Sequence, residues 1–142
     1  MNAVQSSIES TPAIELQQIA VERNELMECW SIEWRIKNKA AHALRIDSVR
    51  LPHGQFKAEE QSFEPALVLS PGADMRFQTA VRCEEPAGLV TENAFLIFRV
   101  VQLGKPWRIF VRVRVAVGSN WEPYAEVELI TTQKAGFSGV SF

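Results

Sequence analysis

The chain has 142 residues, 46% of them hydrophobic and 23% charged, a composition that excludes a disordered or fibrous class and predicts one domain with its own core. Its net charge of −2 at pH 7 offers no overall attraction to nucleic acid or to an anionic membrane. No run approaches the roughly 20 apolar residues that a spanning helix needs, and the N-terminus lacks a basic region followed by an apolar core. We therefore expect a protein without a membrane span, located in the cytoplasm.

Strands are predicted along the whole chain, beginning with a weak edge-strand candidate at residues 14–22. The strongest signal follows at residues 30–37, where Trp30, Trp34 and two isoleucines alternate with polar side chains. A period of two is typical of a strand with one buried face. We expect this strand to direct both tryptophans into the core.

The next segments carry less regular patterns. Residues 44–51 are predicted as a strand with a bulge at Asp47–Ser48, where the alternation breaks. A short helical turn is expected at residues 54–61, and a strand at residues 75–81. Between these two segments, Pro71–Gly72 fits the two central positions of a type II turn.

Two long apolar segments follow. Residues 94–103 are apolar on both parities, as in a central strand covered on both faces. Residues 107–117 alternate strictly and predict an unusually long strand. A two-residue turn that opens with Gly104 predicts an antiparallel hairpin between them. Residues 125–131 are a further candidate for an edge strand.

Roughly seven strands separated by turn signals predict an all-β, antiparallel two-sheet sandwich over residues 12–131. The prolines agree with this arrangement, because we expect none of them inside a strand, where the missing N–H would break the ladder. Flexible segments are expected at residues 1–11 and 132–142.

The strand at residues 30–36 and the hairpin at residues 95–117 resemble those of bacterial immunoglobulin-like and fibronectin type III-like β-sandwich domains. The resemblance implies an immunoglobulin-like fold and carries over no site residue. Two hallmarks of immunoglobulin domains are missing: no tryptophan lies about a dozen residues after Cys29, and Val81 stands two residues before Cys83 in place of tyrosine. The parities of the two cysteines also argue against a disulfide between the sheets.

Residue types that carry catalysis or bind metals are sparse and scattered. The two histidines and two cysteines lack the spacing of zinc sites. The chain has two aspartates, Asp47 and Asp74, and it lacks the Gly-x-Ser-x-Gly motif that would mark a nucleophilic serine. The adjacent pairs Glu59–Glu60 and Glu84–Glu85 fall in turn-like segments, where we expect carboxylates to be solvated. We therefore expect no enzyme activity, no metal and no cofactor.

A stripe of basic residues is the most distinctive feature of the sequence. Arg108, Arg112 and Arg114 project from one face of a single predicted strand, with Phe110 among them, and Arg99 projects from the expected neighbour. One interpretation is a surface that binds anions or an acidic partner. The other, which we favour, is cross-strand pairing with glutamates of the N-terminal or the last strand.

Without a reactive centre, the sequence predicts a non-catalytic protein–protein interaction or structural module that binds another protein or itself. The alternative is a module for an anionic polymer or a saccharide. It would use the arginine stripe or Trp121, a tryptophan in a predicted loop that is suited to stacking on a sugar ring. The negative net charge argues against nucleic acid.

Overall fold

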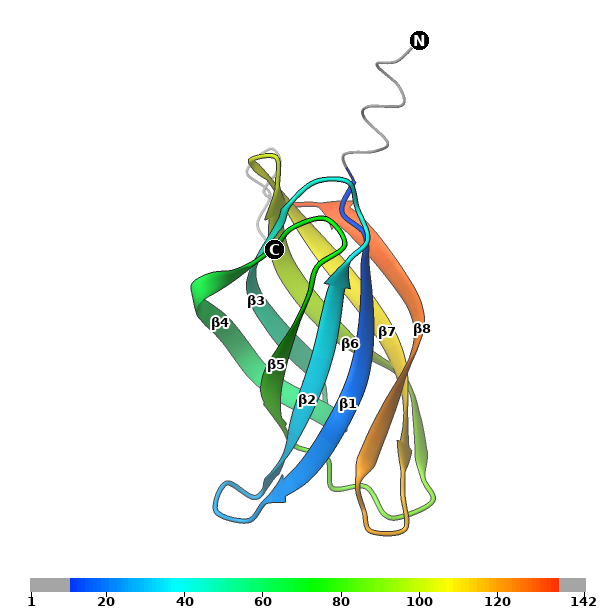
Figure 1. Cartoon of the computed structure of the whole chain (residues 1–142). Helices are drawn as coiled ribbons and strands as arrows, with labels where there is room; N and C mark the ends of the chain where they lie inside the picture. Colours follow the sequence, from blue (N-terminus) through cyan, green and yellow to red (C-terminus); the bar gives the residue numbers. More distant parts are fainter. Residues whose placement is uncertain (1–10, 136–142) are drawn as a thin grey trace.

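The computed structural model describes residues 11–135, so most of the two expected flexible segments lies outside the described residues. Within that range, eight antiparallel strands form two facing sheets (Figure 1). The three-stranded sheet has the order β1-β2-β5, and the five-stranded sheet has the order β4-β3-β6-β7-β8. The antiparallel two-sheet all-β sandwich is confirmed, with one strand more than the sequence indicated. The strands are β1 (Ile14–Asn24), β2 (Cys29–Asn38), β3 (Leu44–His53), β4 (Phe56–Leu69), β5 (Asp74–Val81), β6 (Val90–Gln102), β7 (Lys105–Val117) and β8 (Pro123–Lys134).

The core lies between the two sheets and is filled by side chains from both. As predicted, alternate residues of β2 point inward: Trp30 is 6% exposed, and Ile32, Trp34 and Ile36 are fully buried. The Nε1 of Trp34 donates to Thr79 Oγ1 at 2.9 Å, so the polar atom of this large buried ring is paired. From the opposite sheet, β7 contributes its own alternating buried row, formed by Trp107, Ile109, Val111, Val113, Val115 and Val117.

Two predicted irregularities of the backbone are confirmed. The register of β3 against both of its neighbours shifts between Ile46 and Ser48, at the predicted bulge. Gly72 has a φ of 80°, and the backbone N–H of Ala73 donates to the carbonyl of Ser70 at 2.9 Å. These are the features of a type II turn.

The β6–β7 hairpin forms as predicted, but its turn begins one residue earlier. Gln102 pairs with Lys105, so the turn residues are Leu103 and Gly104, with φ of 53° and 73°. Two positive φ values are typical of a type I′ turn. In the predicted turn, the pair of residues next to the turn would have included Pro106, which has no backbone N–H to donate. In the observed turn this pair is Gln102 and Lys105, and both have a backbone N–H.

Residues 56–69 form a strand that the sequence pattern did not predict. The helical turn expected at residues 54–61 is wrong, and so is the expectation about prolines, because Pro52 and Pro65 lie within β3 and β4. β4 is an edge strand with two register shifts against β3, so inward and outward side chains do not alternate along the full length of the strand. Its free edge also tolerates the missing N–H of Pro65.

β6 is a central strand, as predicted, but only its inner face is covered by another layer. On the outer face Arg99 is exposed, and Phe95 and Val101 are half-buried. The elements of residues 11–135 all belong to the two sheets, and none lies over this face. The expected cover on both faces is therefore wrong: outward apolar residues of β6 are shielded sideways by side chains of neighbouring strands.

The two sheets are joined along both edges. At the β1–β8 edge, the side chain of Gln18 donates to the carbonyl of Pro123 at 2.9 Å and accepts from the N–H of Ala125 at 2.7 Å. At the other edge, the backbones of Lys57 and Arg82 exchange two hydrogen bonds, of 3.0 and 2.7 Å. These contacts protect strand edges that would otherwise pair with other chains.

The last strand runs further than predicted. β8 ends at Lys134, beyond the domain boundary expected at residue 131. Thr132 Oγ1 donates to the carbonyl of Pro12 at 3.4 Å, and Lys134 Nζ lies 5.8 Å from the ring centroid of Trp107. These contacts join residues that are distant in sequence, so the local sequence pattern does not predict how far β8 extends.

Candidate functional site

In the described part of the chain, six arginines point outward from the central strands of the five-stranded sheet. Four are those that the sequence singled out, and the β6–β7 register places Arg99 directly opposite Arg108. The other two, Arg45 and Arg50, lie opposite outward residues of β6. Sequence reasoning missed them because the bulge in β3 hides its parity and nothing local indicates the β3–β6 pairing. We define the arginine face as Arg45, Arg50, Arg99, Arg108, Arg112 and Arg114 with Phe95, Ile97, Phe110 and Leu129.

Apolar side chains alternate with arginines across this face. Arg112 lies between Phe95 on β6 and Leu129 on β8. In the next row, Phe110 lies opposite Ile97. Phe95 and Phe110 are half-buried, and Leu129 is 47% exposed. The arginine face therefore presents guanidinium groups together with accessible apolar area.

Acidic residues of the same sheet pair with some of the arginines, but they are not the expected ones. Arg99 Nε lies 3.5 Å from a carboxylate oxygen of Glu60, and Arg114 Nε lies 3.1 Å from one of Glu92. The expected pairing with the N-terminal strand is wrong, because β1 belongs to the other sheet. Glu126 does lie opposite Arg114. The two ion pairs are exposed to solvent, so each contributes little to stability and is open to exchange with a partner.

Two arginines of the face form no ion pair with an acidic side chain among the described residues. The Nε of Arg112 is buried and has no hydrogen-bond partner within residues 11–135. Arg50 is exposed and forms no ion pair in that range. A buried donor without a partner costs about 1 to 3 kcal/mol, a loss that a partner's carboxylate recovers only if the Arg112 side chain turns to bring Nε into contact with it.

Trp121, the remaining predicted site residue, lies away from the arginine face. It is 53% exposed in the β7–β8 loop, with a φ of 70°. The structure places it beside a solvent-open hollow, at the end of the sandwich. The lining of this hollow, which includes none of the face residues, is Arg23, Glu25, Trp30, Cys83, Glu84, Asn120 and Trp121.

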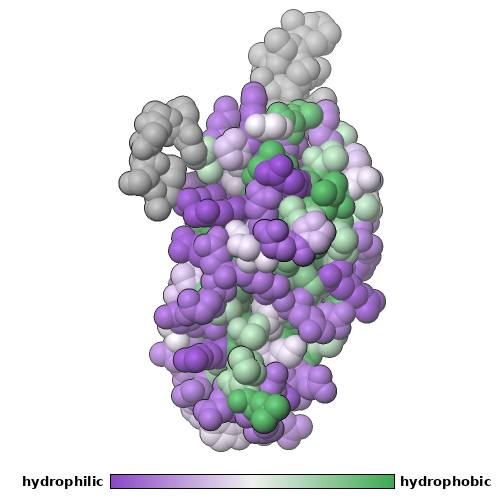
Figure 2. All heavy atoms as spheres, turned by 90° about the vertical axis from the view of Figure 1, so that its left-hand side faces the viewer, coloured by the Kyte–Doolittle hydropathy of each residue, from purple (hydrophilic) through white to green (hydrophobic). Residues whose placement is uncertain are grey.

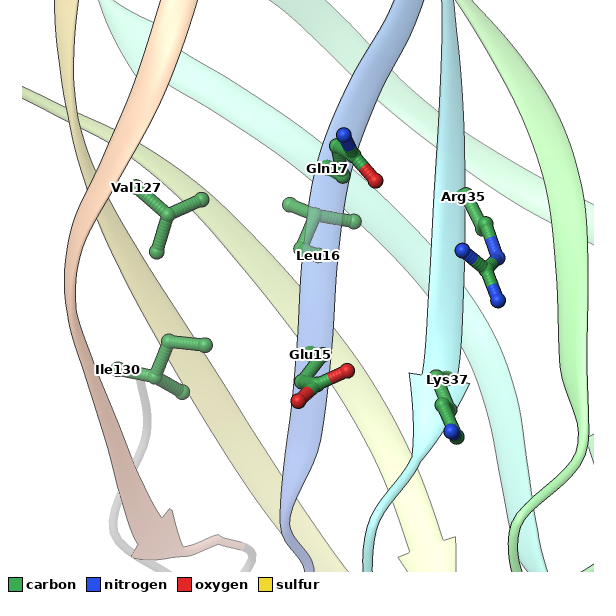
Figure 3. Close-up of a pocket in the computed structure, with 7 residues that line it drawn as sticks. All are labelled: Glu15, Leu16, Gln17, Arg35, Lys37, Val127 and Ile130. Atoms are coloured by element: carbon green, nitrogen blue, oxygen red, sulfur yellow. The ribbon is translucent and has the colours of Figure 1, made fainter.

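A second groove follows the β1–β8 edge (Figure 3). Leu16 on β1 and Val127 and Ile130 on β8 form its apolar part, and Arg35 and Lys37 of β2 lie beyond β1. A hydrogen bond from Gln18 joins β1 to β8, and Thr132 of β8 donates to the carbonyl of Pro12, which lies just before β1. We interpret the groove as the seam where two sheets meet, since its apolar side chains also pack against the core.

The described residues contain neither a metal cluster nor a membrane-spanning helix. In residues 11–135, no group of three or more His, Cys, Asp or Glu side chains is placed to hold a metal ion. The same residues include no helix that is long and apolar enough to cross a membrane. Cys29 and Cys83 are buried free thiols. Burial raises the pKa of Cys83, which makes its sulfur a poorer nucleophile.

Comparisons with known proteins identify no family: no family model matches the chain, and no curated protein matches it. The function must therefore be argued from the geometry of the chain itself.

Proposed function

We propose that this domain is a non-catalytic interaction module that binds an acidic surface of a protein partner on the arginine face. The observation that carries the proposal is the alternation of arginines with half-buried or exposed apolar side chains, Phe95, Phe110 and Leu129, on an open sheet face. Arginine and aromatic residues are enriched at the centres of protein interfaces, where they supply most of the binding energy.

The outer face of the three-stranded sheet provides an internal comparison. There Arg35 and Arg76 also lie directly opposite each other. Arg35 pairs with Asp74, and Arg76 lies 3.8 Å from Glu33. Each of these arginines therefore has its own carboxylate, in contrast to Arg50 and Arg112 of the arginine face. Because two arginines of the arginine face form no such ion pair, this surface is better explained by binding of a partner than by stabilising cross-strand pairs alone.

The balance of charge favours a protein partner over an anionic polymer. Within residues 11–135, at least five carboxylates share the sheet surface with the six arginines, so the local excess of positive charge is at most small. Polyanion binding depends on many uncompensated cations and falls steeply with salt. A mixed surface is better matched by a partner that offers a few carboxylates beside apolar side chains. The five carboxylates are Asp47, Glu60, Glu64, Glu92 and Glu126.

Selection of short random peptides on the immobilised domain tests this proposal. We expect enriched peptides to combine Asp or Glu with Leu or aromatic residues. Substitution of Arg112→Glu together with Arg114→Glu should weaken the best peptide by at least about tenfold, or 1.4 kcal/mol. The matched control, Arg35→Glu with Arg76→Glu, makes the same charge change and also breaks ion pairs, yet should leave peptide affinity unchanged.

Two outcomes contradict the proposal. Equal loss of affinity in both double variants would mean that net charge alone drives binding. Salt-sensitive retention of the domain on heparin, abolished by Arg112→Glu with Arg114→Glu in the absence of any enriched acidic peptide, would favour the anionic polymer instead.

A further inference from the structure

A second surface lies at the end of the sandwich where the β1–β2, β5–β6 and β7–β8 loops meet (Figure 1). Residues of all three loops line one hollow, which brings Glu25, Glu84 and Trp121 together from distant parts of the chain. We define the loop end as residues 25–28, 82–90 and 118–124. It lies opposite the end where β1 starts and β8 finishes.

The loop end concentrates exposed apolar side chains. Leu26 is 96% exposed and Met27 is 64% exposed, so neither contributes to the core. Apolar atoms also gather at the lower end of the face in Figure 2, at the height of the β1–β2 loop in Figure 1. Clustered exposed apolar residues mark interaction surfaces. Of the large exposed hydrophobic side chains in residues 11–135, six lie here: Leu26, Met27, Leu89, Val90, Trp121 and Tyr124.

The Leu26–Met27 tip is held in place by the hairpin. Asn24 and Cys29 pair across its base, and the N–H of Met27 donates to Asn24 Oδ1 at 3.1 Å. Glu28 completes the turn with a φ of 52°. Because the backbone of the tip is already ordered, presenting its apolar side chains to a partner costs little conformational entropy.

The charge of the loop end is opposite to that of the arginine face. Arg82 belongs to the loop end, and Arg23 and Lys57 lie beside it. Arg23 is already engaged, because it lies 5.3 Å from the ring centroid of Trp30 and its Nε lies 3.8 Å from a carboxylate oxygen of Glu25. The hydroxyl of Tyr124 donates to Glu122 at 2.9 Å, which keeps that carboxylate at the surface beside an apolar ring. Five glutamates surround the apolar residues: Glu25, Glu28, Glu84, Glu85 and Glu122.

We infer that the loop end of one copy docks on the arginine face of a second copy. The inference rests on the proposed function, for which it names the partner. Carboxylates beside apolar side chains on one surface meet arginines beside apolar side chains on the other, so the two surfaces complement each other in both charge and polarity. The whole-chain net charge of −2 adds little repulsion between copies.

Such a contact joins unlike surfaces, so it does not close on itself as a two-fold dimer does. Each added copy exposes a new loop end and a new arginine face, and assembly continues unless the rotation closes a ring. The average mass in solution should therefore rise with concentration beyond that of a dimer, and it should fall as salt screens the charges.

A charge-exchange experiment tests the contact by sedimentation at low ionic strength. The face variant carries Arg112→Glu and Arg114→Glu, and the end variant carries Glu25→Lys and Glu28→Lys. Wild type should associate to masses above the monomer value of 16.0 kDa. Each variant alone should stay monomeric, because its two surfaces now have like charges. An equimolar mixture should associate again, because each altered surface meets its opposite on the other variant.

Substitution of apolar residues of the loop end distinguishes this contact from attraction by charge alone. Leu26→Ser with Met27→Ser should weaken association by at least about tenfold. The control is Leu103→Ser, which removes a leucine that is 58% exposed from the hairpin turn at the other end of the sandwich. Circular dichroism melts confirm that each variant is folded.

Each remaining result overturns the inference. A monomeric wild type at low salt, association of either variant alone, or a mixture that stays monomeric would each exclude docking of the loop end on the arginine face. Peptide selection distinguishes this failure from failure of the proposed function. A domain that selects acidic peptides but never self-associates has an arginine face that binds another partner.

Discussion

Replacement of Trp34 by alanine tests the inward orientation of β2, on which the sandwich depends. Trp34 is fully buried, and its ring meets that of Phe56 edge-on with the centroids 6.5 Å apart. Its Nε1 donates to Thr79 Oγ1 at 2.9 Å. Loss of a large buried aromatic ring costs about 3 to 5 kcal/mol in packing and transfer free energy. We therefore expect Trp34→Ala to lower the free energy of unfolding by about 4 kcal/mol, a large share of the 5 to 15 kcal/mol typical of domains.

A double-mutant cycle separates the hydrogen bond from the packing. Trp34→Phe and Thr79→Val each leave one buried polar atom without its partner, at a cost of about 1 to 3 kcal/mol. The double variant removes both polar atoms, so it should be more stable than the sum of the single losses predicts. We expect a coupling free energy of about 1 kcal/mol.

Equilibrium urea unfolding followed by circular dichroism measures these changes, with Arg35→Ala as the control. Arg35 is the next residue of the same strand, and its side chain is 45% exposed. Its substitution should cost no more than about 1 kcal/mol. A near-neutral Trp34→Ala, or an Arg35→Ala that is the more damaging of the two, would mean that β2 faces the other way.

Two further predictions concern local features. A hydrogen bond and the charge of Arg35 lower the pKa of Asp74, so stability from this pair is present above the ordinary aspartate pKa and is lost as pH falls through the lower value. An NMR titration of Asp74 should show the depressed pKa, and Arg35→Gln should raise it toward the ordinary range, because Arg35 is the largest cause of the shift; an unchanged pKa in Arg35→Gln contradicts this cause. Gly72→Ala should destabilise the domain by about 1 kcal/mol, because the φ of Gly72 is 80° although nothing lies near an added Cβ. Gly54→Ala, at a position equally open but without positive φ, should leave the melting temperature unchanged or slightly raised, and equal effects of the two substitutions would refute the argument from strain.

The candidate site was predicted in part. Strict alternation along residues 107–117 placed Arg108, Phe110, Arg112 and Arg114 on one outward face, and the structure places them there. Arg50 escaped prediction because it joins them only through the β3–β6 pairing. Such pairing depends on the register of segments about 50 residues apart, for which a single sequence carries no local signal.

The loop end was not predicted at all. Each of its exposed apolar residues looks ordinary in its own segment, since scattered surface hydrophobic residues are normal. These residues form one surface only because the fold brings three loops, from hairpins and a crossover, to the same end of the sandwich. Trp121 shows this well, because the sequence marked it as an isolated loop tryptophan and the structure places it with Arg23 and Trp30 around one hollow.

The sequence by itself determined which side of β2 and β7 is buried, because side chains alternate with the backbone geometry of a strand whatever the neighbouring strands are. It also determined the turn at Gly72, since positive φ is a local property of glycine. Only the tertiary structure decided the order of the strands, the irregular edge strand β4 and the extension of β8 to Lys134. Those features depend on which distant surfaces pack together, and that choice is made by the core as a whole rather than by any one segment.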